Sequence, residues 1–443
     1  MFKHSKLFLS VGVAVSCLSS SVMAAGFQVN EHSANGLGRA FAGQAATPEN
    51  ASVLATNPAA IGVFKKSQVS GSINYIDPNV DISGQTTSVL NTQAGPVPVA
   101  QANASEDNIA DTAIIPSFFY VKPLDDKLSF GLGAFTTYGL RTDYGSDFEA
   151  LHFANDAEVK SFTINPAVSY KVNDTLRVGF GMNVTYADAE ISSAVPNSLT
   201  PVLEQGLSAQ AGAPVTLPAN ASVFKLEGDD YGFGWNAGVF WQPTSMTNVA
   251  LSYRAETKLE LDGEVSSDLS AGLNQPGSLD LNLAAITELA VNQKLDDQWS
   301  VQASVVFTDW STFEKLEANL ASGDDFLIKE ENFDDSWRGA LGVTYMLNDE
   351  YTLRAGFAYD DGVVTTENRS LSIPDTDRMW YTAGMTYNMT KDTSFDVGYA
   401  FIDGREADIN KTRALGSTGI TSTMVGTQSA NAHILSVQVN HSF

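Results

Sequence analysis

Cysteine is almost absent from this chain, because Cys17 is the only one in 443 residues. It lies in an N-terminal stretch that combines two lysines, a short apolar run and a cleavage site of small residues: Lys3, Lys6, Leu7–Val15 and Val22–Ala24. This order is typical of a secretory signal peptide. We therefore predict that residues 1–24 are removed and that the mature chain begins at Ala25. Such a chain has no cysteine for disulfides, thiolate nucleophiles or metal ligation.

The same stretch has a second, weaker interpretation as a lipoprotein cleavage box around Cys17. Ala14 stands where such a box has a large aliphatic residue. A lipidated Cys17 would also leave a spacer before Ala25 without an evident use. The signal peptide is therefore the preferred interpretation.

Basic residues are scarce, with 25 lysines and arginines against 51 acidic residues. Lys3 and Lys6 leave with the signal peptide, so 23 basic residues remain and the net charge becomes −28. Nucleic acid is excluded as a partner, because phosphate binding needs basic surfaces. Long apolar runs are also missing after residue 24. A secreted chain of this kind is either soluble or a membrane β-barrel.

The local motifs of common enzymes are missing as well. No G-x-S-x-G, H-E-x-x-H or Walker sequence occurs, and the five histidines show no ligand spacing. Acidic pairs such as Asp324–Asp325 leave two interpretations open, a divalent-cation site or solvated loop charge. We predict a protein that is not an enzyme, without catalytic residues or a cofactor, and we assign no metal ligand.

The sequence is rich in two-residue alternation. Large apolar side chains alternate with small or polar ones over Leu176–Tyr186 and Trp299–Thr308, and again over 351–359, 379–387 and 395–401. Side chains of a strand point alternately to its two faces, so this pattern predicts β-strands. We count about fourteen such segments between Ser67 and Phe443, an even number as expected for a closed membrane barrel.

The connections between these segments differ in length. Short polar turns at 123–127, 172–175, 294–297, 347–350 and 390–392 alternate with long loops at about 83–106, 193–228 and 412–427. This asymmetry is typical of an outer-membrane barrel. Aromatic residues near the segment ends fit interfacial girdles: Tyr138, Trp241, Trp299, Trp310, Tyr351 and Trp380. The apolar last strand ends on Phe443, an ending that resembles the signal by which outer-membrane proteins are recognised for insertion.

The segment from Ala25 to Lys66 breaks this pattern. It is rich in glycine and alanine, lacks strand periodicity and carries apolar anchors such as Phe27, Leu37 and Phe41. Such anchors need to be enclosed, and the lumen of a barrel can enclose them. We predict an all-β protein, an outer-membrane antiparallel β-barrel of about 14 strands with an N-terminal hatch (plug) in its lumen. Its parts are a signal peptide (1–24), a hatch (25–66) and a barrel (67–443).

One long loop, about 193–227, carries more apolar residues than a surface loop needs, among them Leu199, Leu203 and Leu207. Two explanations stay open. The residues either pack the loop against itself or form an apolar groove that collects ligand.

Several motifs, in the same order along the chain, resemble the FadL family of outer-membrane long-chain fatty acid transporters: Ala25–Glu31, Gly36–Ala40, Asn57–Ala59, Tyr75–Pro78, Val80–Gly84, Tyr231–Gly238, Asn368–Asp375 and Asp377–Arg378. The resemblance implies a fourteen-stranded barrel with a hatch, a low-affinity groove on the outer loops and a higher-affinity pocket inside. It also implies sideways exit at a kink in the third strand, near Gly131–Leu140.

The resemblance also implies roles for individual residues. Lys329, in the stretch Phe326–Phe333, matches the pocket lysine, and Phe27 matches a hatch phenylalanine near the ligand. Asn57, Pro58 and Ala59 match a hatch tripeptide beside the lateral opening. Ser193 stands where the family has an arginine, so a clamp of two cations is not expected here. Lys329 has an alternative role, neutralising Glu330, Glu331 or another loop acid.

These observations predict passive uptake of long-chain fatty acids or similar amphiphiles across the outer membrane of a Gram-negative bacterium. Leu199, Leu203, Leu207, Phe27 and Lys329 are the expected ligand-binding residues. The expected partners are the fatty acid or another hydrophobic ligand, outer-membrane lipids, and the barrel-assembly machinery during insertion. The alternative is a channel for neutral hydrophobic compounds such as aromatic hydrocarbons, which the loss of the arginine favours and Lys329 opposes.

Overall fold

The computed structural model describes residues 26–415 and 418–443, so the predicted signal peptide lies outside the described residues. All strands belong to one hydrogen-bonded sheet. The sheet begins with β1 (Gln68–Thr92) and ends with β21 (Ile420–Ser442). These two strands pair antiparallel from Gln68 with Ser442 to Leu90 with Ile420, which closes the sheet into a barrel.

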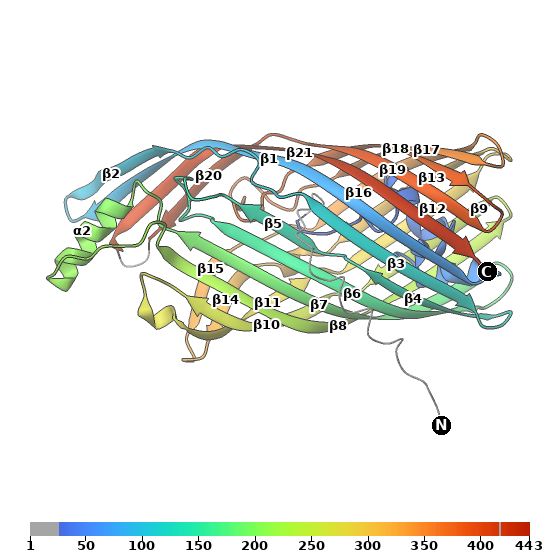
Figure 1. The fold of residues 1–443 in the computed structure, drawn as a ribbon, viewed down its shortest axis with the longest axis horizontal. Coiled ribbons are helices and arrows are strands. Elements are labelled where there is room, and N and C mark those ends of the chain that lie inside the picture. Colours follow the sequence, from blue (N-terminus) through green and yellow to red (C-terminus); the bar gives the residue numbers. More distant parts are fainter. Residues whose placement is uncertain (1–25, 416–417) are drawn as a thin grey trace, which may run out of the picture.

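Fourteen antiparallel strands form the wall, which confirms the predicted fold class (Figure 1). Between β1 and β21 the wall follows the order β3 (Ala113–Pro123), β4 (Leu128–Phe135), β6 (Asp156–Lys171), β7 (Leu176–Ala194), β8 (Ser222–Thr244), β9 (Thr247–Arg254), β12 (Ile286–Lys294), β13 (Trp299–Thr308), β16 (Ser336–Met346), β17 (Tyr351–Asp360), β18 (Arg378–Asn388) and β19 (Thr393–Gly404).

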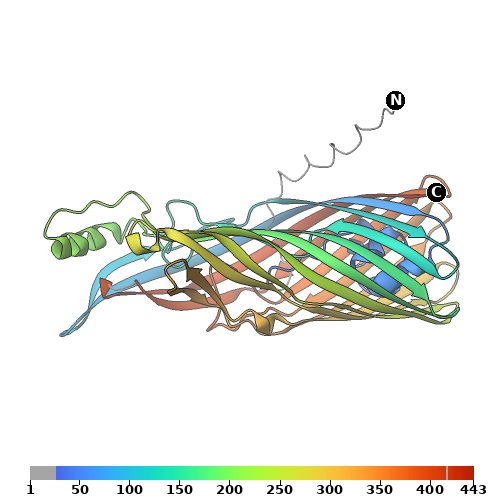
Figure 2. The same ribbon diagram turned by 90° about the horizontal axis from the view of Figure 1, so that it is seen from below.

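The remaining strands lengthen the barrel at one end, away from the C-terminus (Figures 1 and 2). They are β2 (Gly95–Asn103), β5 (Gly139–Asp143), β10 (Thr257–Ser266), β11 (Gln275–Leu283), β14 (Lys315–Leu320), β15 (Asp325–Glu330) and β20 (Ala407–Ala414). Helix α2 (Thr200–Ala211) and the short 3-10 helices η4 (Ala271–Leu273) and η5 (Trp310–Thr312) complete this part. We call this the outer end, because the predicted long loops lie here.

All three predicted long loops are partly strands, and in the loop 193–228 strand β8 already begins at Ser222. Residues 83–106 belong mainly to a hairpin of β1 and β2, and β21 begins at Ile420 inside the stretch predicted as loop 412–427. Outside the membrane these strands carry small polar residues and need no row of large apolar side chains. Their hydrogen bonds to neighbouring strands hold them in place without that pattern.

The alternation along the strands separates a lipid face from a lumen face. Large apolar side chains such as Phe233 and Leu341 are 71% and 64% exposed on the outside. Polar residues such as Asn74 and Thr163 are completely buried on the inside. A water-soluble sandwich would show the opposite arrangement, so this wall is built to face lipid.

The predicted aromatic girdles are confirmed only in part. Trp299, Trp241 and Tyr351 lie on the outside, where ring pairs such as Trp299 and Tyr345 (centroids 4.4 Å apart) form a belt. Tyr138, Trp310 and Trp380 were wrongly placed there, because their side chains are buried in the lumen. Tyr138 and Trp310 lie outside the membrane strands, between β4 and β5 and in η5, and Trp380 lies on the lumen face of β18.

No helix within residues 26–415 and 418–443 is both long and apolar enough to cross a membrane. The helices of the N-terminal segment are short: α1 (Ala34–Leu37), η1 (Gln44–Ala46), η2 (Ala51–Ala55) and η3 (Pro58–Val63). They lie inside the barrel toward the end that holds the C-terminus (Figure 1). We use the term N-terminal segment for residues 26–66.

Glycines of the wall make room for the N-terminal segment. Gly342 and Gly356 are partners on β16 and β17, and a side chain on Gly356 would lie 2.2 Å from the backbone of Arg39. Gly179 and Gly238 are partners on β7 and β8, and they lie against the backbone of Pro58 and the side chain of Asn57. The segment therefore fits closely against at least two sides of the lumen.

Candidate functional site

The third strand of the barrel is broken, and the N-terminal segment fills the break. β4 ends at Phe135 and β5 begins at Gly139, which lies within the range 131–140 expected for a kink. In the described sheet β5 pairs with β6 alone. The backbone amide of Val29 donates to the carbonyl of Thr137 (2.7 Å), and the amide of Gly139 donates to the carbonyl of Phe27 (2.9 Å). Residues 27–29 thus take the place of a missing strand partner.

Phe27 lies in a cage of aromatic rings beside this break. Its ring centroid is 4.7 Å from Trp310, 5.5 Å from Phe313 and 5.9 Å from Tyr138. The hydroxyl of Tyr138 donates to the carbonyl of Ala284 (2.5 Å), which fixes one wall of the cage. Edge-on contacts of this kind stabilise aromatic pairs by about 0.5–1.5 kcal/mol each. Phe27 is therefore held firmly in this conformation.

An apolar cavity begins at Phe27 and extends toward the outer end. Aliphatic and aromatic side chains from six or more elements line most of it: Phe27, Leu140, Val159, Ile191, Leu226, Leu279, Leu281, Phe313, Leu316 and Ile373. Its volume is about 30 Å³. Small-molecule sites are commonly about 300–1,000 Å³, so a long acyl chain enters only if side chains such as Phe27 move.

A loop between β17 and β18, residues 361–377, folds into the lumen above this cavity. Its Asp375 is buried, accepts from the amide of Val363 (2.6 Å) and pairs with Arg378. The other oxygen of Asp375 accepts from the amide of Gly26 at 3.3 Å. The loop therefore contacts both the cavity, through Ile373, and the start of the N-terminal segment.

Lys329 lies on β15, and its ammonium group bonds to the hydroxyl of Ser370 in the same loop. It also lies 3.4 Å from a carboxylate oxygen of Glu331, which is fully buried. Burial lowers the pKa of Lys329 and raises the pKa of Glu331. The structure thus shows the predicted alternative partner, Glu331, at Lys329, and Lys329 does not line the apolar cavity.

The predicted groove residues on the long loop lie farther out. Leu199 and Leu203 are buried in a cluster with Leu415 and Ile420, and Leu207 is half-buried on α2. This placement supports loop packing for the first two. Ser193, at the position of the family arginine, is buried on β7 opposite Phe224.

The tripeptide Asn57, Pro58 and Ala59 binds the wall at β6, β7 and β8. The Asn57 amide donates to the carbonyl of Val239 (3.2 Å), and its oxygen accepts from the amide of Ala59 (2.9 Å). The hydroxyl of Ser169 donates to the carbonyl of Ala59 (2.8 Å). The part of the N-terminal segment that bonds to the β4–β5 break is residues 27–29.

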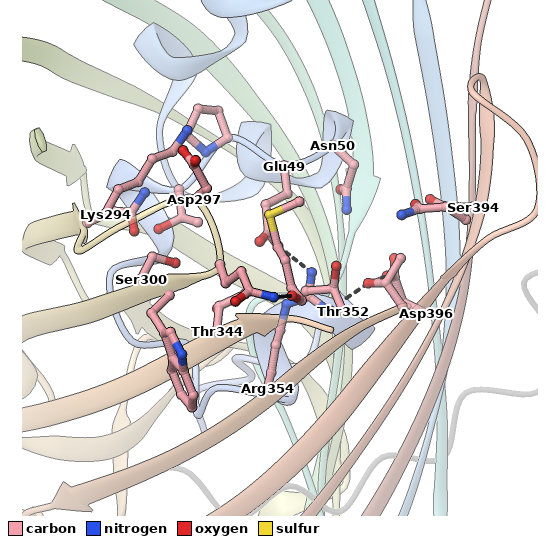
Figure 3. A pocket seen from close by; sticks show the side chains of 18 of the residues that line it. Glu49, Asn50, Lys294, Asp297, Ser300, Thr344, Thr352, Arg354, Ser394 and Asp396 are labelled. Atoms are coloured by element: carbon pink, nitrogen blue, oxygen red, sulfur yellow. Dashed lines mark hydrogen bonds and ion pairs between the residues drawn. The ribbon is translucent and has the colours of Figure 1, made fainter. Parts of the chain in front are cut away.

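A polar chamber of about 640 Å³ lies at the end of the barrel near the C-terminus (Figure 3). Glu49 of the N-terminal segment pairs there with Arg39 (2.9 Å) and with Arg354 of β17 (3.2 Å). Burial alone would raise the pKa of Glu49, but the charges of Arg354 and Arg39 bring it to about 2. Asp396 and Asn440 add further polar groups to the lining.

Sequence reasoning missed several of these residues. Trp310 and Tyr138 around Phe27 were assigned to girdles, and Glu49, Asp375 and Arg354 were not singled out. Their partners are distant in the chain, 305 residues for Glu49 and Arg354 and 349 residues for Asp375 and Gly26. An acidic residue within a Gly- and Ala-rich segment was the available sequence signal at Glu49. In the part of the chain that the structure describes, no group of three or more His, Cys, Asp or Glu residues could hold a metal ion.

Comparison with known proteins identifies relatives of this chain. A family model described as "Outer membrane protein transport protein (OMPP1/FadL/TodX)" matches residues 15–443. The "Long-chain fatty acid transport protein" of Escherichia coli K12 is 35% identical over 427 residues, which cover 91% of this chain and 93% of that protein. "Outer membrane protein P1" of Haemophilus influenzae is 33% identical over 439 residues and 95% of both chains.

Solved structures show the same fold. A Pseudomonas aeruginosa FadL homologue has a TM-score of 0.80 at 22% identity and covers 95% of this chain and 100% of its own. The P. putida toluene transporter TodX has a TM-score of 0.62 at 19% identity, covering 89% and 94%. The matches of the family model and of the two relatives cover nearly the whole chain. The chain therefore belongs to the OMPP1/FadL/TodX family of outer-membrane transport proteins.

Proposed function

We propose that this outer-membrane protein takes up long-chain fatty acids passively and releases them sideways through its wall. One observation carries the proposal: an apolar cavity ends at Phe27, and the backbone beside Phe27 closes a break in the wall. The relatives at 33–35% identity, one of which is named for long-chain fatty acid transport, support this choice of ligand.

In this proposal the outer end gathers the ligand. Leu199, Leu203 and Leu207 give the long loop its apolar character there. The acyl chain then enters the cavity, and the carboxylate stays near Lys329 at its outer end. Burying a chain of about 16 carbons at ~0.8 kcal/mol per CH₂ outweighs a single ion pair of ~1 kcal/mol, so the tail sets affinity and the cation sets orientation.

The N-terminal segment, residues 26–66, acts as the hatch. An acyl chain that displaces Phe27 pulls on residues 27–29 and weakens their bonds to Thr137 and Gly139. The break in the third strand is then free for the chain to leave toward the lipid. Asn57, Pro58 and Ala59 hold the rest of the hatch on the wall during this movement.

The polar chamber supports sideways release over axial release. An acyl chain that continued along the barrel axis would meet Glu49, Arg354 and Asp396. An acyl chain whose apolar surface faces these solvated charges gains none of the free energy that it gains on contact with lipid.

The alternative is passage of neutral hydrophobic compounds such as aromatic hydrocarbons. Its specific support is that no lysine or arginine among the described residues lines the apolar cavity and that Lys329 already has Glu331 as a partner. The aromatic cage around Phe27 would also suit a flat aromatic ring.

Uptake assays distinguish fatty acid uptake from passage of neutral hydrophobic compounds. The protein is expressed in a Gram-negative host that lacks its own transporter of this family, and uptake of labelled oleate and labelled toluene is measured. We expect oleate uptake well above that of cells with the empty vector. Enhanced toluene uptake without enhanced oleate uptake would replace the proposal with the alternative.

A further inference from the structure

The turn at Glu49 and Asn50 ties the N-terminal segment to the wall through a chain of polar contacts. One oxygen of Glu49 accepts from Arg39 (2.9 Å) and from Arg354 of β17 (3.2 Å) (Figure 3). The side-chain amide of Asn35 donates to the same oxygen (2.7 Å). Arg39 is completely buried in the segment, and Arg354 is buried on the wall. Glu49 thus joins a buried cation of the segment to a buried cation of the wall.

From Arg354 the contacts continue across the wall. Arg354 donates to the hydroxyl of Thr386 on β18 (2.6 Å), and this hydroxyl donates to Asp396 on β19. The side-chain amide of Asn440 on β21 donates to the other oxygen of Asp396 (2.6 Å). The side-chain oxygen of Asn440 accepts from the hydroxyl of Ser70 on β1 (2.7 Å). The contacts therefore run through five neighbouring strands, from β17 to β1.

These contacts cross the closure seam, the pairing of the first strand β1 with the last strand β21. Ser70 and Asn440 are register partners in this pairing. The hydroxyl of Ser70 also lies 3.5 Å from the side-chain oxygen of Asn50. The chain of contacts thus begins and ends at two consecutive residues of the N-terminal segment, Glu49 and Asn50.

Helix α1, which starts at Ala34, is held on the same side of the lumen. The amide of Ala34 donates to the side-chain oxygen of Gln438 on β21 (2.9 Å). A Cβ at Gly398 of β19 would lie 2.4 Å from the carbonyl oxygen of Ala34. In the order of the wall, these strands lie opposite β6, β7 and β8, which hold Asn57–Ala59. The N-terminal segment is therefore held on two opposite sides of the barrel.

We propose that the contacts of Glu49 and Asn50 fix residues 34–50 to the closure seam and thereby keep the lumen closed to water-soluble solutes. A wall of fourteen strands encloses more space than its own side chains fill, so an aqueous passage opens if this part of the segment leaves its place. A polar solute in the chamber of about 640 Å³ meets Glu49 directly. This role does not depend on which hydrophobic ligand crosses the wall.

Influx of arabinose, a small uncharged sugar, into liposomes that contain the purified full-length protein tests the proposal. Glu49→Gln removes the carboxylate shared by the two arginines, and Arg354→Gln removes the cation of the wall. The matched controls are Asp297→Asn and Lys294→Gln, which make the same kinds of charge change in the same chamber but outside this chain of contacts. Migration on unheated gels shows whether each variant forms a closed barrel.

We expect Glu49→Gln and Arg354→Gln to raise arabinose influx roughly tenfold or more, because each leaves a buried partner charge uncompensated. The double variant should raise influx no further than the more permeable single variant, since both changes break the same contact. Both controls should stay at the wild-type rate. Trypsin should cut after Arg39 in the two permeable variants alone, because Arg39 is completely buried while the segment stays in place.

Wild-type influx in Glu49→Gln and Arg354→Gln, or an equal rise in the two controls, would overturn the inference and leave the proposed function standing. Arg354→Lys keeps the charge but cannot donate in the same two directions, and it takes the place of the stronger variants if they do not form a closed barrel. A rise in its arabinose influx then supports the inference, and wild-type influx overturns it.

Discussion

Phe27 and Lys329 are the two side chains on which the proposed binding and release of ligand depend most. Phe27 contacts three rings, and its carbonyl accepts one of the two backbone hydrogen bonds that close the wall. Lys329 contacts a loop hydroxyl and a buried carboxylate. In the proposed mechanism, ligand binding at both positions would replace an interaction that the protein makes with itself.

Removing the ring of Phe27 should make the wall leaky. Phe27→Ala leaves the aromatic cage without its centre and removes about 3–5 kcal/mol of packing free energy from the segment at the break. We expect faster entry of small hydrophobic solutes, measured as toluene influx into vesicles that contain the purified protein. Phe233→Ala, on the lipid face, is the control. Equal influx for the two variants would show that Phe27 does not close the route.

Lys329 and Glu331 should have opposite effects on the ligand. Lys329→Ala removes a charge-assisted bond of about 1.5–3 kcal/mol, so oleate should bind roughly 10- to 100-fold more weakly and oleyl alcohol as before. Glu331→Gln frees Lys329 from its partner, and oleate should bind more tightly. Calorimetric titrations with oleate and with oleyl alcohol measure these changes in affinity. Lys315→Ala is the control, because the side chain of Lys315 is exposed. Equal changes for the two ligands would remove Lys329 from the head-group site.

The N-terminal segment as a whole is also held by contacts with other parts of the protein. Its short helices lack the length for independent stability, so the wall must hold it. Gly179 and Gly238 on one side and Gly342 and Gly356 on another let its backbone approach the strands closely. Hydrogen bonds such as those from Ser169 to Ala59 and from Arg338 to Ala40 add to this close fit.

A side chain at Gly179 should displace this element and leave the barrel intact. Its Cβ would lie 2.2 Å from the amide nitrogen of Ala59, so Gly179→Val pushes η3 away from the wall. Gly339→Val is the matched control, because a Cβ at Gly339 meets nothing within 4 Å. We expect normal barrel migration on gels for both variants, and lower oleate uptake together with higher antibiotic entry for Gly179→Val alone. Normal uptake by this variant would mean that the contact of Asn57–Ala59 with the wall has no part in gating.

The strands show which elements the sequence predicts well. Lipid-facing strands such as β7 and β13 were predicted because large residues recur at every second position. Beyond the membrane this signal ends, and the β1–β2 hairpin was expected to be a loop. Phe27 and Lys329 came from family resemblance, and their partners Trp310 and Ser370 could not be predicted, because contacts across the lumen join residues far apart in the chain.

At the scale of the whole molecule, the barrel combines a lumen that holds the N-terminal segment with a wall that is interrupted in its third strand. The N-terminal segment lies inside the barrel (Figure 1), and polar and charged side chains line the chamber at the end near the C-terminus (Figure 3). The break between β4 and β5 is closed by two backbone hydrogen bonds from residues 27–29. We propose that the ligand leaves sideways through this break.

A reversible disulfide across the break tests this claim directly. Gln28 and Tyr138 form an antiparallel bridge, and the mature chain should contain no other cysteine once Cys17 has been removed. Directly paired residues of antiparallel strands lie within the Cα separation of about 4.4–6.8 Å that a disulfide spans. The measurement is oleate uptake by the double variant Gln28→Cys and Tyr138→Cys, oxidised and then reduced, beside the two single variants. We predict that oxidation stops uptake and that reduction restores it to the level of the single variants, whereas equal uptake by the oxidised and reduced protein would contradict release through the wall.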